Sequence, residues 1–231
     1  MNKLIVVTLL LGVTSNVFAK DRSNSIYFLT SLGKSDYSDM TTRSDISTAK
    51  ANIITNLNSL FTLQNPESEL PGYSVELNAD DSGTSIGFGV GYIFHKYLSI
   101  EASYQYLGSV KVTGQISDEE SNQVGYSKSA VIGGFDLRTF LHTPSVKGFN
   151  AFIHWGATLW SRESEVQYFF DDIKSSERFK DEGFEVVHGW GFQYQSNSGF
   201  GATLIWEQYN IGQENLDVLK ATLLYKFKFG L

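Results

Sequence analysis

The chain has 231 residues, no cysteine, 14% aromatic residues and a formal net charge of −7 at pH 7. The lack of cysteine excludes a disulfide scaffold and a lipid anchor attached through cysteine. The acidic balance argues against nucleic acid as a partner, because phosphate binding requires a basic face.

The first 19 residues contain the three parts of a secretory signal peptide. Lys3 supplies a positive start, Leu4 to Val13 form a short apolar run, and Ala19 ends a stretch with small residues. The run is too short to span a bilayer, which needs about 20 apolar residues. We therefore expect residues 1–19 to be a cleaved signal peptide and residues 20–231 to form one domain.

Eight later segments alternate apolar and polar side chains with a period of two. That period is typical of β-strands, and segments of about 10 residues are typical of transmembrane barrels. The clearest segment contains Ile86, Phe88 and Val90, which alternate with glycines. The sequence predicts an all-β fold, an eight-stranded antiparallel transmembrane β-barrel, with strands at residues 24–35, 84–94, 98–106, 129–140, 150–160, 184–195, 200–209 and 219–231.

The connections between these segments alternate in length. Long connections at residues 36–82, 115–123 and 163–183 are separated by short ones at residues 95–96, 142–148 and 197–199. Outer-membrane barrels have short periplasmic turns and longer extracellular loops. With an even number of strands, the pattern predicts a protein of the cell outer membrane with both termini in the periplasm.

Aromatic residues lie near the ends of the predicted strands, where the two membrane interfaces favour amphipathic rings. Tyr106, Trp160 and Tyr209 are near the outer ends, whereas Phe149 and Tyr194 are near the short turns. A soluble, lipocalin-like barrel would show the same alternation, with its apolar side facing a ligand cavity. The signal peptide, the two aromatic belts and the loop asymmetry favour the membrane barrel.

The stretch from Ser85 to Val110, SIGFGVGYIFHKYLSIEASYQYLGSV, resembles the second and third strands of the OmpA-type family of small outer-membrane barrels. The stretch YFLTSLGKSDYS is similar to the first strand of that family. The ending LLYKFKFGL looks like its assembly signal, with Leu231 in place of the usual final Phe. The resemblance implies a barrel domain recognised by the barrel-assembly machinery, without the periplasmic peptidoglycan-binding domain of large family members.

Charged residues share the inward side of the predicted strands. A barrel of about eight strands is filled by side chains and has no open aqueous pore. Because an unpaired buried charge is costly, we expect these side chains to pair across the lumen. The pairs either form a structural plug or exchange partners to gate a narrow channel. The set comprises Glu101, Asp136, Arg138, Glu207, Lys220, Lys226 and Lys228.

The sequence gives little support for an enzyme. Modification of lipid A would need a serine beside a histidine base, or an equivalent cluster. None of the four histidines, His95, His142, His154 and His188, forms a His-x-Ser pair. The acidic pairs at residues 80–81 and 171–172 lack the spacing of a calcium loop. We therefore expect no catalytic residue, no metal site and no cofactor.

The first long connection contains apolar residues at helical spacing, preceded by Asp45 as a candidate cap and followed by Pro66. The pattern predicts a short helix that is apolar on one side. This helix either packs on the barrel or presents its apolar face to a partner. The face consists of Ile46, Ile53, Leu57, Leu60 and Phe61.

Together these features predict a Gram-negative outer-membrane protein with a structural, envelope-integrity and surface-recognition role through its extracellular loops. The alternative is a narrow porin-like channel gated by lumen salt bridges, and a lipid A-modifying enzyme is third. The expected partners are outer-membrane lipid, lipopolysaccharide and the barrel-assembly machinery, with an extracellular ligand, a host surface or a phage at the loops. We expect a monomer that binds no nucleic acid.

Overall fold

The computed structural model describes residues 24–38, 51, 54–55, 74–80, 82–117, 123–170, 173–212 and 214–228. The predicted signal peptide at residues 1–19 lies outside this part of the chain, and so do the last three residues. Ala51, Ile54 and Thr55 of the first long connection are described and helical. The predicted apolar helix face lies outside the described residues: Ile46, Ile53, Leu57, Leu60 and Phe61.

The described residues form nine strands in one antiparallel sheet. Two of the short turns contain a glycine with positive φ, Gly148 at 91° and Gly199 at 95°, a conformation that other residues rarely adopt. The strands are β1 (Ser25–Asp36), β2 (Ser74–Asp80), β3 (Ser82–His95), β4 (Leu98–Ser117), β5 (Gln123–His142), β6 (Phe149–Phe170), β7 (Ile173–Gln195), β8 (Phe200–Ile211) and β9 (Glu214–Lys228).

The sheet closes into a barrel because its first and last strands pair. Strand β1 pairs with β9 from Ser25↔Lys228 to Asp36↔Asp217, and with β3 on its other side. The remaining strands pair in chain order, and the β4–β5 pairing completes the ring. Strands β2 and β3 share one of the eight positions, because each pairs with a different half of β4. The predicted eight-stranded antiparallel barrel is confirmed.

Strand β4 bulges between the half that pairs with β3 and the half that pairs with β2. Its register with β5 shifts between Tyr106 and Gly108, and Gly108 has a φ of 109°. The extra residue reverses which positions of β4 face inward. Odd-numbered residues face inward as far as Leu107, and even-numbered residues do so from Val110 onward. The bulge therefore marks the boundary between two parts of the wall.

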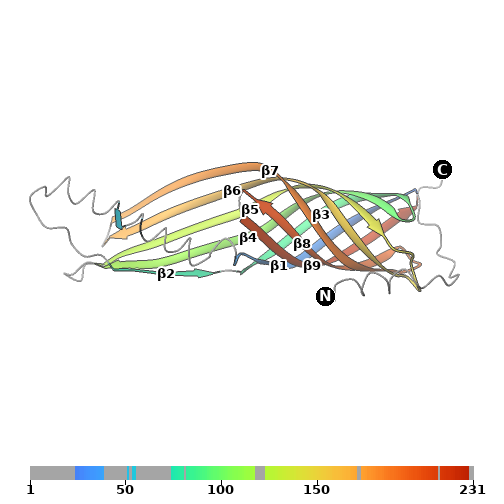
Figure 1. Ribbon diagram of the computed structural model, residues 1–231, viewed down its shortest axis with the longest axis horizontal. Helices are drawn as coiled ribbons and strands as arrows, with labels where there is room; N and C mark the ends of the chain where they lie inside the picture. The colour runs from blue at the N-terminus through green and yellow to red at the C-terminus, as the bar shows by residue number, and fades with distance from the viewer. Residues whose placement is uncertain are drawn as a thin grey trace, which may run out of the picture.

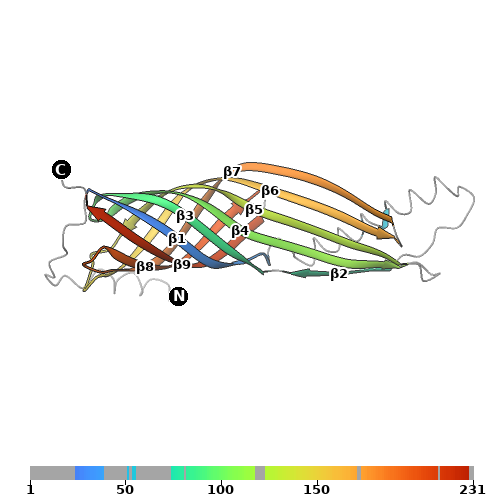
Figure 2. The same cartoon turned by 180° about the vertical axis from the view of Figure 1, so that it is seen from behind.

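Beyond this boundary, four strands continue without the other half of the ring. Strands β6 and β7 pair as far as Phe170↔Ile173, whereas β8 starts to pair with β7 only at Val187. We name the continuing wall the extension: residues 109–117, 123–131, 161–170 and 173–182, together with β2. In Figure 1 it runs to the left past β1, β3, β8 and β9, and Figure 2 shows it from behind.

The expectation of a long loop at residues 163–183 is wrong, because residues 163–170 and 173–183 lie in paired strands. Of the loop expected at residues 115–123, residues 115–117 and 123 also lie in paired strands. Their outward side chains are polar, such as Glu163 on β6 and Lys180 on β7, so the contrast with the inward side is weak in sequence. The short turns, the start of β1 and the end of β9 lie at the opposite end, which we call the turn end (Figure 1).

Outward side chains of the ring form an apolar belt. Exposed apolar residues run from Phe149 to Leu159 on β6 and from Phe184 to Tyr194 on β7. These lengths match the roughly 9–11 residues that a tilted strand needs to cross a bilayer. Within the described part of the chain, no helix has the length and apolar character needed to cross a membrane.

Two aromatic residues expected in the outer belt face the lumen instead. Trp160 is 6% exposed and Tyr209 is 0% exposed. Inward positions are even on β6 and odd on β8, so both residues fall on the lumen side. Near the turn end, Phe149 and Tyr194 are exposed in the belt, as expected.

Candidate functional site

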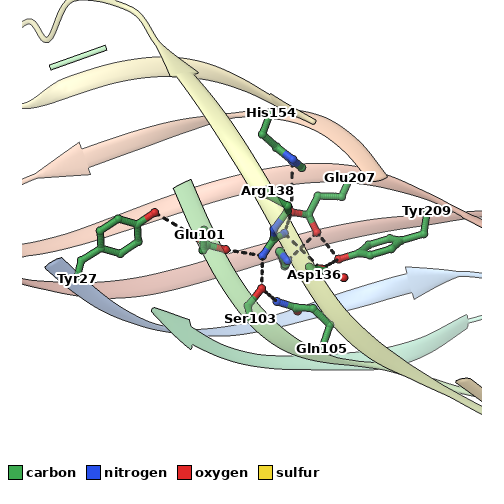
Figure 3. A network of polar contacts seen from close by, with 10 residues as sticks. Tyr27, Glu101, Ser103, Gln105, Asp136, Arg138, His154, Glu207 and Tyr209 are labelled. Atoms are coloured by element: carbon green, nitrogen blue, oxygen red, sulfur yellow. Dashed lines mark hydrogen bonds and ion pairs between the residues drawn. The ribbon is translucent and has the colours of Figure 1, made fainter. Parts of the chain in front are cut away.

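A cluster of charged side chains crosses the lumen of the ring (Figure 3). Arg138 on β5 is 1% exposed and lies between glutamates from two other strands. Its guanidinium donates hydrogen bonds to Glu101 on β4 and to Glu207 on β8. It also donates to the Ser103 hydroxyl at 2.7 Å. One buried cation thus connects β4, β5 and β8 across the barrel.

Glu207 is the second centre of this network. Its Oε2 lies 2.6 Å from Lys220 Nζ on β9, and its Oε1 lies 3.3 Å from His154 Nε2 on β6. The Tyr209 hydroxyl lies 2.9 Å from Glu207 Oε2 and 2.9 Å from Asp136 Oδ2. In the dry interior these charge-assisted contacts are stronger than they would be in water, which makes each one costly to break.

The network has more carboxylates than permanent cations, three against two: Glu101, Asp136 and Glu207 against Arg138 and Lys220. The Tyr209 hydroxyl is directed at both Asp136 and Glu207. Asp136 lies 3.8 Å from Arg138, whereas Glu207 contacts both cations. Asp136 is therefore the less strongly paired of these two carboxyl groups.

Two glycines give the network room. The Tyr27 hydroxyl donates to Glu101 Oε2 at 3.2 Å, and a Cβ at Gly91 would overlap the Tyr27 ring. A Cβ at Gly189 would lie 2.5 Å from His154 Nε2. The inward glycines Gly91 and Gly189 therefore leave space in the lumen for the large side chains of Tyr27 and His154.

An apolar layer closes the lumen on the extension side of the network. Along β8 the order is Glu207, Tyr209 and then Ile211, so the apolar residue lies nearer the extension. Each member is at most 6% exposed. We name these nine residues the plug: Tyr37, Leu107, Ile132, Trp160, Val187, Tyr209, Ile211, Leu216 and Val218.

A second apolar layer lies toward the turn end. It consists of two buried clusters, Tyr27, Leu29 and Leu224 on one side and Phe140, Phe152 and Ile205 on the other. A cavity of about 30 Å³ is lined by these side chains and by Arg138 and Glu101. That volume accommodates about two water molecules. The network is therefore held between two apolar layers, with room for water but not for an open pore.

Five of the seven charged residues predicted to face the lumen meet in this network: Glu101, Asp136, Arg138, Glu207 and Lys220. Lys226 lies on the inward side of β9, nearer the turn end than Lys220. Lys228 ends β9, and its side chain is outside the described part of the chain. The sequence analysis missed Tyr27 and Tyr209, although Tyr209 shares the inward parity of Glu207 two positions earlier.

The structure also brings together three residues that are far apart in sequence. Ser99 Oγ lies 3.0 Å from His142 Nε2, and Asn150 Nδ2 lies 3.2 Å from His142 Nδ1. A serine beside a histidine that is held by a third side chain can be a nucleophile with its base. Each ring nitrogen of His142 therefore has a side-chain partner, Ser99 at Nε2 and Asn150 at Nδ1. Ser99 itself is 1% exposed.

No group of three or more acidic or histidine side chains with metal-binding geometry occurs among the described residues. The three lumen carboxylates are instead engaged by Arg138, Lys220 and Tyr209. The donor set of this site therefore suits internal ion pairing, because each of the three carboxyl groups already has a cation or a hydroxyl group as a partner.

A closed ring of eight strand positions with an apolar exterior and a polar, filled interior defines a transmembrane β-barrel. The chain belongs to the family of the OmpA-like transmembrane domain, whose model matches residues 21–215. It is therefore an outer-membrane β-barrel protein, as the sequence predicts.

Several solved structures are similar to this chain at low sequence identity. The N-terminal β-barrel domain of Pseudomonas aeruginosa OprF is 11% identical, with 90% of this chain and 100% of that chain covered and a TM-score of 0.39. OprG of Pseudomonas aeruginosa is 10% identical, with coverages of 90% and 97% and a TM-score of 0.44. Ail, the attachment invasion locus protein of Yersinia pestis, is 11% identical, with coverages of 89% and 99% and a TM-score of 0.39. No curated protein matches this chain.

Proposed function

We propose that this protein is a sealed barrel with a structural, envelope-integrity role that presents its extension for recognition at the cell surface. The contrast between its two parts carries the proposal. The lumen is filled by a charge network between two apolar layers, whereas four strands continue well past the apolar belt. A filled lumen suits anchoring better than transport, and a long ordered wall outside the bilayer suits binding.

The extension faces the outside of the cell in this proposal, and the turn end, with both termini, faces the periplasm. The short turns support this orientation, because outer-membrane barrels keep their short connections in the periplasm. The outer surface of the extension is charged and suited to water: Arg178 Nη2 lies 3.7 Å from Glu165, and Lys180 is ion-paired with Glu182.

The tip of the extension offers aromatic side chains for contact. Phe169 is 39% exposed on the outward face of β6, whereas Tyr168 lies on the inward face with its ring centroid 5.6 Å from that of Tyr126. Exposed aromatic residues on a rigid strand are favourable anchors for a protein or glycan surface, because they bury a large area at a small cost in side-chain entropy. Such a tip supports an extracellular ligand, a host surface or a phage as the partner.

Shortening the extension tests the recognition role. Ser161 and Glu182 are paired across β6 and β7, so a tight turn that replaces residues 162–181 leaves the barrel register intact. We expect the shortened protein to remain a heat-modifiable barrel while its cells lose binding to host cells, matrix proteins or phage. The matched control is Ser198→Ala in an exposed turn at the other end. Unchanged binding by the shortened protein, across surfaces that the full protein binds, would refute the recognition role.

A narrow channel is the second candidate. Its support is the mixed charge network beside a small cavity in the lumen. Conduction would require the plug to move, because the plug closes the extension side of that network. Planar bilayers that contain the wild type, Glu101→Gln or Glu207→Gln test this candidate. Stepwise conductance in either variant would favour the channel, and silence in all three would eliminate it.

The remaining parts of the proposal concern partners. Outer-membrane lipid and lipopolysaccharide would contact the apolar belt, and the barrel-assembly machinery would insert the chain. A monomer is sufficient, because the barrel satisfies its own strand edges within the ring. The proposal includes no enzymatic activity, which the burial of Ser99, the serine beside His142, supports.

A further inference from the structure

The inward face of the extension carries an apolar cluster although it lies beyond the belt; we name this face, with Val75 and Leu77 of β2, the trough. Val75 and Tyr126 are buried there, and Leu77, Val112 and Val166 pack against them. Burial also raises the pKa of the Tyr126 hydroxyl. An apolar surface of this kind needs a covering, because water contact with it is unfavourable.

A cavity of about 410 Å³ lies between this cluster and the plug. Its walls include Val110, Ala130 and Val166, while Phe179 at its side is 52% exposed. At the rim, Arg162 holds Asp181 and Glu214 at 3.1 Å each, which joins β6, β7 and β9. The trough is therefore a walled groove with a paired, charged rim, and its lining combines apolar residues with Lys128 and Ser164.

The connection between β1 and β2 begins and ends at opposite ends of the trough. Strand β1 ends at Asp36, beside Ser82 and Asp217, at the level where the complete ring ends. Strand β2 starts at Ser74, which pairs with Ser117 at the far end of β4, and then runs back toward the ring. Residues 39–73 must therefore travel the length of the extension, about 26–30 Å at about 3.3 Å per strand residue.

Ile54 identifies the face along which this connection travels. It packs against the buried cluster of Val75 and Tyr126, on the inward side of the extension. The neighbouring Thr55 hydroxyl donates to the carbonyl oxygen of Ala51 at 2.8 Å, a spacing of four residues that is typical of a helix. The connection therefore contacts the trough through Ile54, which is in a helical conformation.

We propose that the apolar side of residues 46–61 occupies the trough as an internal partner of the extension. A helix of this length measures about 24 Å at 1.5 Å per residue, close to the length of the trough. Its apolar positions, Ile46, Ile53 and Leu57, recur at the spacing that keeps them on one side together with Ile54. The polar side of the segment then forms the outer surface that an external partner would meet.

This proposal goes beyond the recognition role, because it concerns which face of the first connection is hidden and not what the extension binds. It also decides between the two alternatives for the apolar residues of that segment, in favour of packing. Its failure would leave the sealed lumen untouched, since the charge network and the plug are formed by other residues.

Engineered cysteines test the proposal cleanly, because the chain has none of its own. Val112 faces the trough and Thr113, the next residue on β4, is exposed on the opposite face. Val112→Cys and Thr113→Cys are each combined with Leu57→Cys in the full-length protein in lipid vesicles. We expect a disulfide or a short bismaleimide cross-link with Val112→Cys and none with Thr113→Cys. Equal cross-linking of both pairs, or of neither, would overturn the proposal.

Single-cysteine labelling gives an independent measurement. We expect maleimide to react with Val112→Cys at least about tenfold more slowly than with Thr113→Cys, because a covered thiol reacts only when its contact opens. Replacement of residues 46–61 with a glycine–serine linker of equal length should abolish this difference. Heat-modifiable migration shows that each variant is folded. Fast labelling of Val112→Cys in the folded full-length protein would mean that the trough is open to an external partner, and the proposal would be wrong.

Discussion

The Tyr37 hydroxyl donates a hydrogen bond of 2.7 Å to the carbonyl oxygen of Leu107, the residue at which strand β4 bulges. The Ser35 hydroxyl donates to the same oxygen. Because Tyr37 follows β1 and β3 lies between β1 and β4, the contact spans a strand. The two hydrogen bonds to Leu107 therefore fix the backbone of β4 at the boundary between the complete ring and the extension.

Substitutions at this bulge should destabilise the barrel in a graded way. Tyr37→Phe should cost about 1 kcal/mol, the usual net contribution of a buried hydrogen bond. Gly108→Ala should cost about 1–3 kcal/mol, because it forces a side chain into a disfavoured backbone region. Its Cβ would also lie 2.7 Å from the Tyr37 hydroxyl. Urea unfolding in lipid vesicles, followed by tryptophan fluorescence, measures both changes.

Ser109→Ala is the control for the bulge, since Ser109 is the next residue on β4 and is exposed. It should change stability by less than about 0.5 kcal/mol. If Gly108→Ala were as stable as Ser109→Ala, the bulge would not depend on its glycine.

The unequal pairing of Asp136 and Glu207 can be tested with two conservative substitutions. Asp136→Asn should cost less than about 1 kcal/mol, because the amide oxygen can still accept from Tyr209 and Arg138 lies 3.8 Å away. Glu207→Gln should cost about 3–5 kcal/mol, because it leaves Arg138 and Lys220 without their shared counter-charge. The same urea unfolding assay applies. The reverse order of destabilisation would show that Asp136 is the more strongly paired carboxyl group.

Ser99 should not behave as a catalytic nucleophile. A fluorophosphonate probe should label the wild type no more than Ser99→Ala, because Ser99 is 1% exposed and the probe cannot reach it in the filled lumen. Ser103→Ala, which removes another buried lumen serine, controls for a general effect on the barrel. Labelling of the wild type and Ser103→Ala, but not of Ser99→Ala, would show that the pair is active.

Ion pairs at the rim of the trough should matter less than those in the lumen. The Arg162 side chain is 27% exposed, and its partners Asp181 and Glu214 are more exposed still. Arg162→Met should therefore cost about 0.2–1 kcal/mol, the usual range for such pairs. Arg138→Met should cost about 3–5 kcal/mol, since it leaves buried carboxylates unpaired. Similar losses in the two variants, in the urea assay, would contradict this distinction.

The strands of the ring could be predicted from the sequence, because lipid requires apolar side chains on the outer face while the inner face is polar. Phe88 and Val90 alternate with glycines on β3, and Phe227 alternates with lysines on β9, so the period of two survives in each strand. The extension was missed for the converse reason. Outside lipid, Glu163 and Lys180 occupy outward positions, and the alternation no longer separates strand from loop.

The charge network in the lumen could be predicted only in part. Parity placed Glu101 and Arg138 on the inward side, but parity does not say which side chains meet. The approach of Tyr209 to Asp136, and of Ser99 to His142, depends on the register between strands distant in the chain. The bulge at Gly108 adds a further obstacle, because it reverses the parity of β4 partway along its length.

The pairing of Ser25 with Lys228 has a kinetic consequence. These residues lie at opposite ends of the described chain, so the ring closes only through a contact of very high sequence separation. Such contacts make folding slow, because the entropy of a long loop is lost before any pairing energy is gained. In lipid, a sheet that lacks β9 would expose two unpaired edges. The ring can therefore close only once the last strand is available, and loss of that strand would abolish the barrel rather than yield a smaller one.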